Sequence, residues 1–466
     1  MGGLARVVYT AAALALAFMG LTIAFFAVNA GDEELSREAE QMLKPPENPY
    51  AAAENLYVAL AGFDAPRGVP IIAAGQKTIA AYDRIASLSA KDRKAAHAAA
   101  GAERSDRLQV RGGFDCRPAV KSCWSAVENR RTEHASELKA NEDLYRRYLQ
   151  LHAMRGYFDT SKPSMDTPNG YAPAPLKTLF LESVALRIKD ARTAPERSVG
   201  LADLDRDIRT WRAMLTGHGN IVSKFVAIHH LHADYALLAD ILGDSRLDLS
   251  SHLREIEDML SRVEPNDWKI AGALDYEFRM IAALFVDIER EQSGPLIESH
   301  APGEKAPWWQ SLVPGEWSSY FRGNATRNLA ARHMLEVRRV AAADGRDCAA
   351  EQARLHRWRE EHLTPGVGYF KNPIGKILLS VGSTAYDDYP LRAHDAAGFH
   401  RLVKLGFEVR RQNVSDDAIP AFIKRHAWAS HPVSEEPFAW DASKRELVMA
   451  PLAPVNKERR FRIPVK

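Results

Sequence analysis

Residues 220–242, NIVSKFVAIHHLHADYALLADIL, contain neither glycine nor proline, and their apolar side chains recur at the period of an α-helix. When successive residues are placed about 100° apart around a helix axis, Phe225, Ile228 and Tyr235 fall on the same stripe as Ile221. The stretch therefore predicts a helix with one apolar face.

The same period runs through most of the chain after residue 31. Further helices are expected at about 32–44, 49–62, 72–88, 124–154, 176–191, 200–216, 247–263, 267–292 and 325–363 (the last as two helices that meet near Asp344-Gly345), with one starting at 373 and one ending near 412. The tail differs, since the short apolar stretches PFAWD and RELVMAPL lie on either side of ASK and RRFRIPV follows. It predicts a small β-hairpin with an optional third strand. The expected fold class is mainly α: an N-terminal transmembrane helix, a multi-helix array and a small C-terminal β-hairpin.

Two segments without a helical period suggest how the chain is divided. Residues 156–175 contain four prolines and two glycines, and residues 293–318 also have the composition of a loop. The expected regions are a membrane segment (1–30), an N-terminal helical region (31–155), a central helical domain (156–292) and a C-terminal helical region that ends in the hairpin (293–466).

The N-terminal segment 7–28, VVYTAAALALAFMGLTIAFFAV, carries no charge. An apolar run of about 18 or more residues is long enough to span a bilayer as a helix. Arg6 precedes this run, and Asp32, Glu33 and Glu34 follow it. Because basic flanks stay on the cytoplasmic side, the pattern predicts that the rest of the chain lies outside the cytoplasm.

A cleaved signal peptide is the alternative, since Val28-Asn29-Ala30 fits a small-x-small cleavage site. Signal peptides usually have an apolar stretch of about 7–15 residues, and the longer run here favours an uncleaved anchor. The abundance of alanine and arginine is typical of a bacterial protein. We therefore expect an inner-membrane protein with its bulk in the periplasm.

The three cysteines are consistent with an oxidising compartment. Cys116 and Cys123 lie close together in FDCRPAVKSCW, without the two further ligands that a zinc site requires. Such a pair predicts a local disulfide that closes a loop. Cys348 is then left as a buried free thiol.

Charge excludes one class of partner. The chain has 62 basic and 60 acidic residues, a formal net charge of +2, and no strongly basic stripe. A nucleic-acid-binding protein usually carries such a stripe, so nucleic acid is not expected as a partner.

The histidines of residues 220–242 are the first candidates for chemistry, because histidine binds metals and carries protons near neutral pH. His232 falls within the apolar stripe and His229 beside it, whereas His230 falls on the opposite face with Asp234. Two inward histidines supply only two ligands, and the glutamate of the HExxH pattern is missing, so no metal is predicted. The pair is either a hydrogen-bonded part of the core or a catalytic pair.

Glu277 is the second candidate, because it lies within the apolar stripe of the helix expected over 267–292. A buried carboxylate is costly unless it is paired, hydrogen-bonded or protonated. Basic side chains that also fall on buried stripes of other predicted helices are Arg131, His134, His152 and Arg187. We therefore predict an interior Glu–Arg–His network, with Arg187 as the first candidate partner of Glu277.

This network has two interpretations. It is either a polar core that fixes how the helices pack, or a site in which Glu277 acts as general acid or base with His229 or His232. The sequence contains no GxSxG, SxxK, P-loop or GxGxxG motif, and no cofactor is predicted.

The aromatic stretch APWWQSLVPGEW brings Trp308, Trp309 and Trp317 together. The three rings form either a platform for a glycan, peptide or lipid headgroup, or a cap on the helical array. With Arg187 they are the candidate ligand-binding residues.

The leading hypothesis is a membrane-anchored periplasmic protein with a helical domain that binds or scaffolds a partner in the cell envelope. Residues 7–28 contact the inner membrane, and the partner is an envelope protein, a glycan or a lipid. The alternative hypothesis is an α-helical periplasmic hydrolase or lyase that uses Glu277 with His229 or His232.

Overall fold

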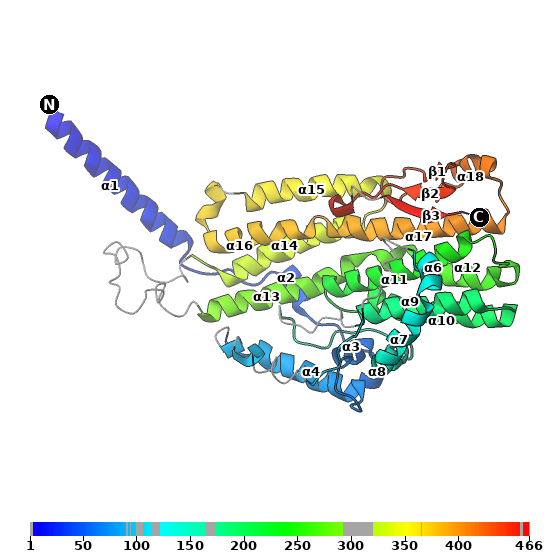
Figure 1. The fold of residues 1–466 in the computed structure, drawn as a ribbon. Coiled ribbons are helices and arrows are strands. Elements are labelled where there is room, and N and C mark those ends of the chain that lie inside the picture. Colours follow the sequence, from blue (N-terminus) through cyan, green and yellow to red (C-terminus); the bar gives the residue numbers. More distant parts are fainter. Residues whose placement is uncertain are drawn as a thin grey trace. The chain divides into compact units, whose positions relative to one another are not determined.

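The structure is a computed structural model that describes residues 3–89, 92–93, 95–98, 106–112, 122–164, 173–291, 320–364, 366–456 and 460–465. Its fold is mainly α, with an apolar N-terminal helix and a small C-terminal antiparallel sheet, which confirms the predicted fold class (Figure 1). Contacts divide the chain into two compact units. Unit 1 comprises Met1–Pro45, Phe278–Val337 and Ala353–Ala385; unit 2 comprises Pro46–Glu277, Arg338–Gln352 and Tyr386–Lys466.

Helix α11 (Ile221–Gly243) forms the centre of unit 2. It begins at Asn220, whose side-chain oxygen accepts a hydrogen bond of 2.8 Å from the Ser223 backbone N–H, a typical helix cap. It packs against α9 (Ala174–Asp190), α10 (Ala194–Thr216), α17 (Tyr389–Arg411) and β3 (Phe461–Pro464) (Figure 1). Its buried residues therefore cover most of the helix surface, while one strip that includes Val222 and His229 stays exposed or half-buried.

The segment predicted as one helix over 124–154 is divided in the structure, and that prediction was wrong. It forms α6 (Cys123–Ala126), a 3₁₀ turn η2 (Val127–Arg130), α7 (Arg131–Ala140) and α8 (Glu142–Leu151). A 3₁₀ turn advances by about 120° per residue, since it has about 3.0 residues per turn. It therefore shifts which side chains face the core.

The remaining helices of unit 2 lie around this centre. They are η1 (Ala52–Glu54), α3 (Leu56–Ala61), α4 (Ile71–Ala86), η3 (Ser250–His252), α12 (Leu253–Ser261), η4 (Pro265–Trp268), η5 (Ile270–Gly272), η10 (Asp416–Ala418) and α18 (Ile419–Arg425). Helices α3 and α4 cross so closely that a Cβ atom on Gly75 would lie 1.9 Å from the Val58 carbonyl oxygen. Only glycine fits at that crossing.

The tail forms a three-stranded antiparallel sheet in the order β1 (Ala439–Asp441), β2 (Glu446–Met449) and β3, which confirms the hairpin and adds the third strand. A 3₁₀ turn, η11 (Pro454–Asn456), precedes β3. Leu447 pairs with Ile463, and both side chains are buried where the sheet packs on α11 and α17.

Unit 1 contains α1 (Gly3–Val28) and α2 (Arg37–Leu43), the adjoining parts of α13 (Ala273–Glu291), α14 (Gly323–Ala342) and α15 (Gly345–Leu363), then η8 (Val367–Phe370), α16 (Pro373–Ser383) and η9 (Thr384–Tyr386). The chain that follows α1 is bonded to α14. The Asp32 carboxylate accepts hydrogen bonds from the backbone N–H groups of Asn324 (2.7 Å) and Ala325 (3.0 Å), and the Asn328 side chain accepts one from Ser36 N (2.7 Å).

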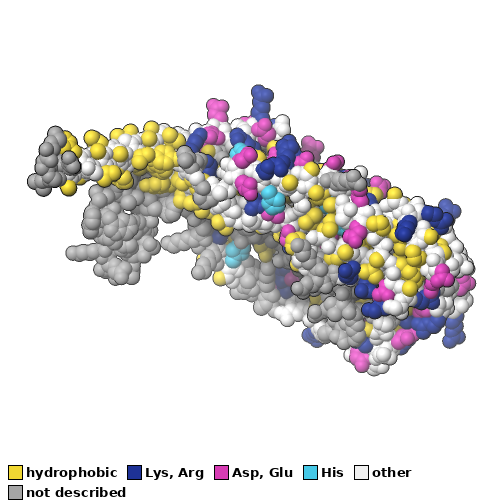
Figure 2. All heavy atoms as spheres, turned by 90° about the horizontal axis from the view of Figure 1, so that it is seen from above, with side chains coloured by type: hydrophobic (Ala, Val, Ile, Leu, Met, Phe, Trp, Pro, Cys, Tyr) yellow, Lys and Arg dark blue, Asp and Glu magenta, His cyan; other side chains and the backbone are white. Residues whose placement is uncertain are grey.

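Within α1, residues Val7–Val28 are long and apolar enough to cross a membrane, and none of this stretch is buried in the protein. Figure 2 shows hydrophobic side chains covering this helix. Both an anchor and a signal sequence have these properties.

Candidate functional site

Glu277 is buried, as predicted, with a relative exposure of 6%. The prediction that an arginine or histidine neutralises it was wrong. Its carboxylate accepts hydrogen bonds from the backbone N–H of Ile221 (2.7 Å) and from the hydroxyl of Tyr386 (3.1 Å). Ile221 is the first residue of α11, where backbone N–H groups have no partner within the helix. Glu277 therefore acts as a cap for α11.

Burial also sets the protonation behaviour of this carboxyl group. Burial raises the pKa of Glu277, although the hydrogen bonds from Ile221 and Tyr386 act in the opposite direction. A raised pKa is found both in general acids and in buried structural carboxyl groups. The residues that surround Glu277 therefore decide which role it has.

Arg187 lies on the surface, contrary to the prediction. Its side chain is 47% exposed and forms an ion pair with Asp203. It belongs to the last turn of α9, where its long side chain can reach solvent beyond the packed part of the helix. It is not part of a buried network with Glu277.

The orientations predicted for the histidines of α11 were also wrong. His230 and Asp234, expected on the solvent face, are 1% and 0% exposed, whereas His229 is exposed. His232 is half-buried and stacks on Phe399 with ring centroids 4.0 Å apart. The physical reason is that apolar residues such as Val222 and Phe225 lie beside the histidines on the partly exposed strip of α11, so hydrophobic periodicity does not mark the inward face.

His230 belongs to the core. Its ring stacks on Trp211 with centroids 3.7 Å apart and planes 12° apart. Burial lowers the pKa of His230 well below its usual value, and the nearby Lys177 ammonium adds to this effect, so the ring is neutral at pH 7.

A buried polar network joins α8, α9, α10 and α11. The Lys177 ammonium forms ion pairs with both Asp207 and Asp234. Asp207 also accepts hydrogen bonds from the Tyr148 hydroxyl (2.9 Å) and contacts His152 Nε2 (2.8 Å). The side chains of Lys177 and the two aspartates are 4%, 0% and 0% exposed. Solvent and substrate therefore have no access to them.

Burial and neighbouring charges act on the two aspartates of this network in opposite directions. Burial would raise the pKa of Asp207, but Lys177 and His152 together hold it below its usual range. Burial raises the pKa of Asp234 well above its usual value, despite the opposing effect of Lys177. Opposite charges thus meet inside a sealed core, an arrangement that suits a structural role.

A second cluster contains His134, one of the predicted basic residues, together with Arg130, which was not predicted. Arg130 and His134 contact the fully buried Glu182 at 2.6 Å and 3.2 Å. Arg131, predicted to face inward, instead pairs with Asp190 on the surface (2.7 Å, side chains 46% and 55% exposed). The 3₁₀ turn η2 explains the difference, because its change of phase turns Arg130 toward Glu182.

Among the cysteines, Cys123 is disulfide-bonded and Cys348 is a buried free thiol. Cys116 lies outside the described residues, so the Cys116–Cys123 pairing stays a prediction. Trp308, Trp309 and Trp317 also lie outside the described residues. Within the described residues, no group of three or more His, Cys, Asp or Glu side chains could hold a metal ion.

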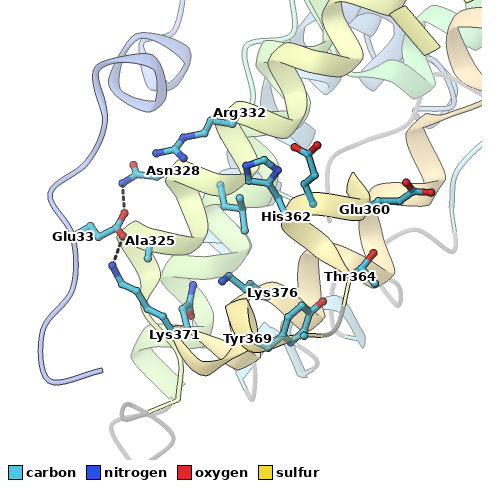
Figure 3. A pocket seen from close by; sticks show the side chains of 14 residues that line it. Glu33, Ala325, Asn328, Arg332, Glu360, His362, Thr364, Tyr369, Lys371 and Lys376 are labelled. Atoms are coloured by element: carbon cyan, nitrogen blue, oxygen red, sulfur yellow. Dashed lines mark hydrogen bonds and ion pairs between the residues drawn. The ribbon is translucent and has the colours of Figure 1, made fainter. Parts of the chain in front are cut away.

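Unit 1 contains a cavity of about 470 Å³ that the sequence did not reveal (Figure 3). It lies among the segment after α1, helices α14 and α15, the 3₁₀ turn η8 and helix α16. Its lining residues are Glu33, Ala325, Asn328, Leu329, Arg332, Glu360, Glu361, His362, Thr364, Gly366, Tyr369, Lys371, Asn372 and Lys376. Three acidic and three basic side chains are among them.

The basic side chains of this cavity gather around Glu33. Lys371 Nζ lies 2.6 Å from a Glu33 carboxylate oxygen, and the Asn328 amide donates to the other oxygen at 3.2 Å (Figure 3). The hydrogen bond from Lys371 holds the pKa of Glu33 below its usual value. Burial and the neighbouring Lys371 lower the pKa of Lys376, which lies above the Tyr369 ring (6.0 Å to its centroid). The cavity therefore presents an ion pair, Glu33–Lys371, together with further charged side chains of both signs.

The stretch GYFKNPIGK (368–376) carries a sequence signal for this cavity, since two aromatic residues and a lysine directly precede the helix start at Asn372-Pro373. The other walls come from distant parts of the chain, since Glu33 lies 338 positions before Lys371 and 295 positions before Asn328. No protein-family model matches the chain, and no curated protein or solved structure matches it.

Proposed function

We propose that the chain is a single-pass protein of the bacterial inner membrane whose helical bulk lies in the periplasm and binds a partner in the cell envelope. The apolar helix at Val7–Val28 supports an anchor. Arg6 before it and Asp32, Glu33 and Glu34 after it support the outward orientation of the bulk.

The side chain of Asn29 favours an uncleaved anchor over a signal peptide. It is 1% exposed, donates to the Phe370 carbonyl (2.8 Å) and accepts from the Asn372 backbone N–H (2.8 Å). Cleavage after Ala30 would remove a residue that is built into unit 1. A retained segment keeps these bonds and holds the protein at the membrane.

The use of Glu277 as a helix cap is the observation that carries the preference for binding over catalysis. Its hydrogen bonds go to the start of α11 and to Tyr386. A general acid or base needs a side chain within reach of a substrate, with a partner such as a histidine beside it. His229 lies on the surface and His232 packs on Phe399, and neither bonds to Glu277 within the described part of the chain.

Complementation tests this proposal. In a strain that lacks the protein, a chain with Glu277→Gln, His229→Ala and His232→Ala together is expected to restore the wild-type phenotype when it accumulates to the same level. Each substitution removes an acid–base group, while glutamine keeps an oxygen that can cap α11. A variant that folds, reaches the membrane and restores nothing would support the catalytic alternative.

A further inference from the structure

Helix α16 presents an apolar face to solvent. The side chains of Phe370, Ile377, Leu378 and Val381 are 37%, 48%, 38% and 75% exposed. On a helix, Ile377, Leu378 and Val381 fall within an arc of about 100°, opposite the buried Leu379 and Ser383. Surface helices of globular proteins normally have the reverse arrangement, with apolar side chains toward the core.

This face begins directly at the end of the apolar helix α1. Asn29, the residue after α1, is hydrogen-bonded to Phe370 and Asn372, and α16 starts at the next residue, Pro373. Phe25, within the last turn of α1, contacts the rings of Phe370 (5.2 Å between centroids) and Tyr320 (5.4 Å). Of these rings, tyrosine, here Tyr320, is a residue typical of the boundary between a membrane and water.

The cavity of unit 1 lies on the same structural elements. Two of its lining residues, Lys371 and Asn372, lie in the chain between Phe370 and the start of α16. A third, Lys376, lies in the first turns of α16, next to the exposed Ile377. Figure 3 shows Lys371 and Lys376 on one side of the cavity, with Arg332 further along it on α14. Cationic side chains beside an apolar, membrane-level surface match a phosphate group that is attached to acyl chains.

We propose that α16 and Phe370 lie in the outer surface of the same membrane that holds α1, and that the cavity binds the phosphate of a phospholipid through Lys371, Lys376 and Arg332. This inference rests on the proposed membrane anchor. The lipid is favoured over a protein partner because the apolar face is bonded to the end of the anchor, where the bilayer surface must be. The lining contains Glu33, Glu360 and Glu361 as well as three cations, so a zwitterionic headgroup matches its balance of charge.

Fluorescence from a label on Val381 tests the apolar face. The full chain with Val381→Cys carries an environment-sensitive dye and is reconstituted in nanodiscs of phosphatidylethanolamine and phosphatidylglycerol. Burial raises the pKa of the Cys348 thiol to about 11, so the added thiol reacts in preference to it, and the labelled wild-type chain measures the background. We expect blue-shifted emission and strong quenching by nitroxide-labelled lipids. Ile377→Cys should behave in the same way.

Ala353→Cys is the matched control within unit 1. It is exposed on α15, about 13 Å along the helix axis from His362 at the cavity. Its label should emit as in water and resist quenching. A Val381 label that behaves like the Ala353 label in an inserted chain would overturn the inference and leave the anchor intact. A blue-shifted Val381 label that lipid nitroxides fail to quench would also overturn it, because protein would then cover the face. A chain that fails to insert contradicts the anchor itself.

Retained lipid tests the cavity. The full chain purified in detergent is expected to keep more phospholipid per chain than the variant Lys371→Gln/Lys376→Gln, as measured by mass spectrometry of extracted lipid. Lys269→Gln is the matched control, since Lys269 also pairs with a carboxylate, Asp344, at 2.9 Å. It should retain the wild-type amount. Equal retention by all three proteins would overturn the assignment of the headgroup.

Discussion

The Glu277 carboxylate accepts a 2.7 Å hydrogen bond from the backbone N–H of Ile221, the residue at which α11 begins. A carboxylate in an apolar stripe of α13 thus caps the first turn of α11, the helix at the centre of unit 2. The consequence for stability differs from that of a buried ion pair, because no positive side chain is left behind when the acid is removed.

Removal of the Glu277 side chain should weaken folding moderately. Glu277→Ala leaves a buried N–H and the Tyr386 hydroxyl without this acceptor, and such a loss typically costs about 1–3 kcal/mol. Glu277→Gln keeps an acceptor oxygen and should cost less. Chemical denaturation of the two variants measures the order. A larger loss for Glu277→Gln than for Glu277→Ala would contradict the capping role.

The carboxyl group of Asp240 should make the free energy of unfolding depend on pH. Burial raises the pKa of Asp240 from 3.8 to about 6, although the Ser122 hydroxyl (2.6 Å) acts against this. Between these two values the folded protein holds a proton that the unfolded chain has released, so stability falls as pH rises through this window.

Denaturation of wild type and Asp240→Asn over about pH 3.5 to about 7 isolates this contribution as a difference between the two proteins. The wild type should lose stability relative to the variant as pH rises, and the difference should level off above about pH 6. A difference of the opposite sign, or none, would show that Asp240 is not buried as described.

Lys177 should be among the residues least tolerant of substitution. Lys177→Met places Asp207 and Asp234 in the core without their ammonium partner, and breaking a buried pair in this way typically costs about 3–5 kcal/mol. Arg131→Met is the control, because its pair with Asp190 is solvent-exposed and should matter little. Thermal melting distinguishes the two. Comparable melting of Lys177→Met and wild type would refute the structural role of the network.

Cysteine pairing gives a prediction for protein purified from the membrane fraction. Cys123 is disulfide-bonded and Cys348 is a free buried thiol, so mass spectrometry of an unreduced digest should recover a Cys116–Cys123 peptide pair. A loop of this size stabilises by roughly 2–3 kcal/mol on the chain-entropy model, so its loss should be tolerated in a chain of this length. A peptide in which Cys348 is bridged would contradict the local loop.

Sequence periodicity predicted the helices well, because most of them bury one apolar face against the core and so repeat apolar residues at the helical period. It failed for His229 and His230, since apolar residues such as Val222 line the partly exposed strip of α11 while the polar His230 faces the core. It also failed for Arg131, because a 3₁₀ turn before α7 changed the phase of the helix. A local irregularity of this kind leaves little trace in composition.

The polar interior was predicted in kind, and His134 and His152 belong to it as predicted, but its acidic members and Lys177 were not foreseen. Lys177, Asp207 and Asp234 look like surface residues in a sequence, and only their meeting in three dimensions allows them to be buried. Glu277 was predicted to be buried, yet its partner is a backbone N–H group, which every residue except proline possesses. The cavity of unit 1 was missed because Glu33 meets Lys371 across 338 positions of the chain.

The orientation of the chain in the membrane tests the central claim most directly. Alkaline phosphatase folds into an active enzyme only outside the cytoplasm, so we compare its fusion to the C-terminus with a fusion of a reporter that is active only in the cytoplasm. Both should fractionate with the membrane. We predict that the phosphatase fusion is active and the cytoplasmic reporter silent. An inactive phosphatase fusion with an active cytoplasmic reporter would contradict the account.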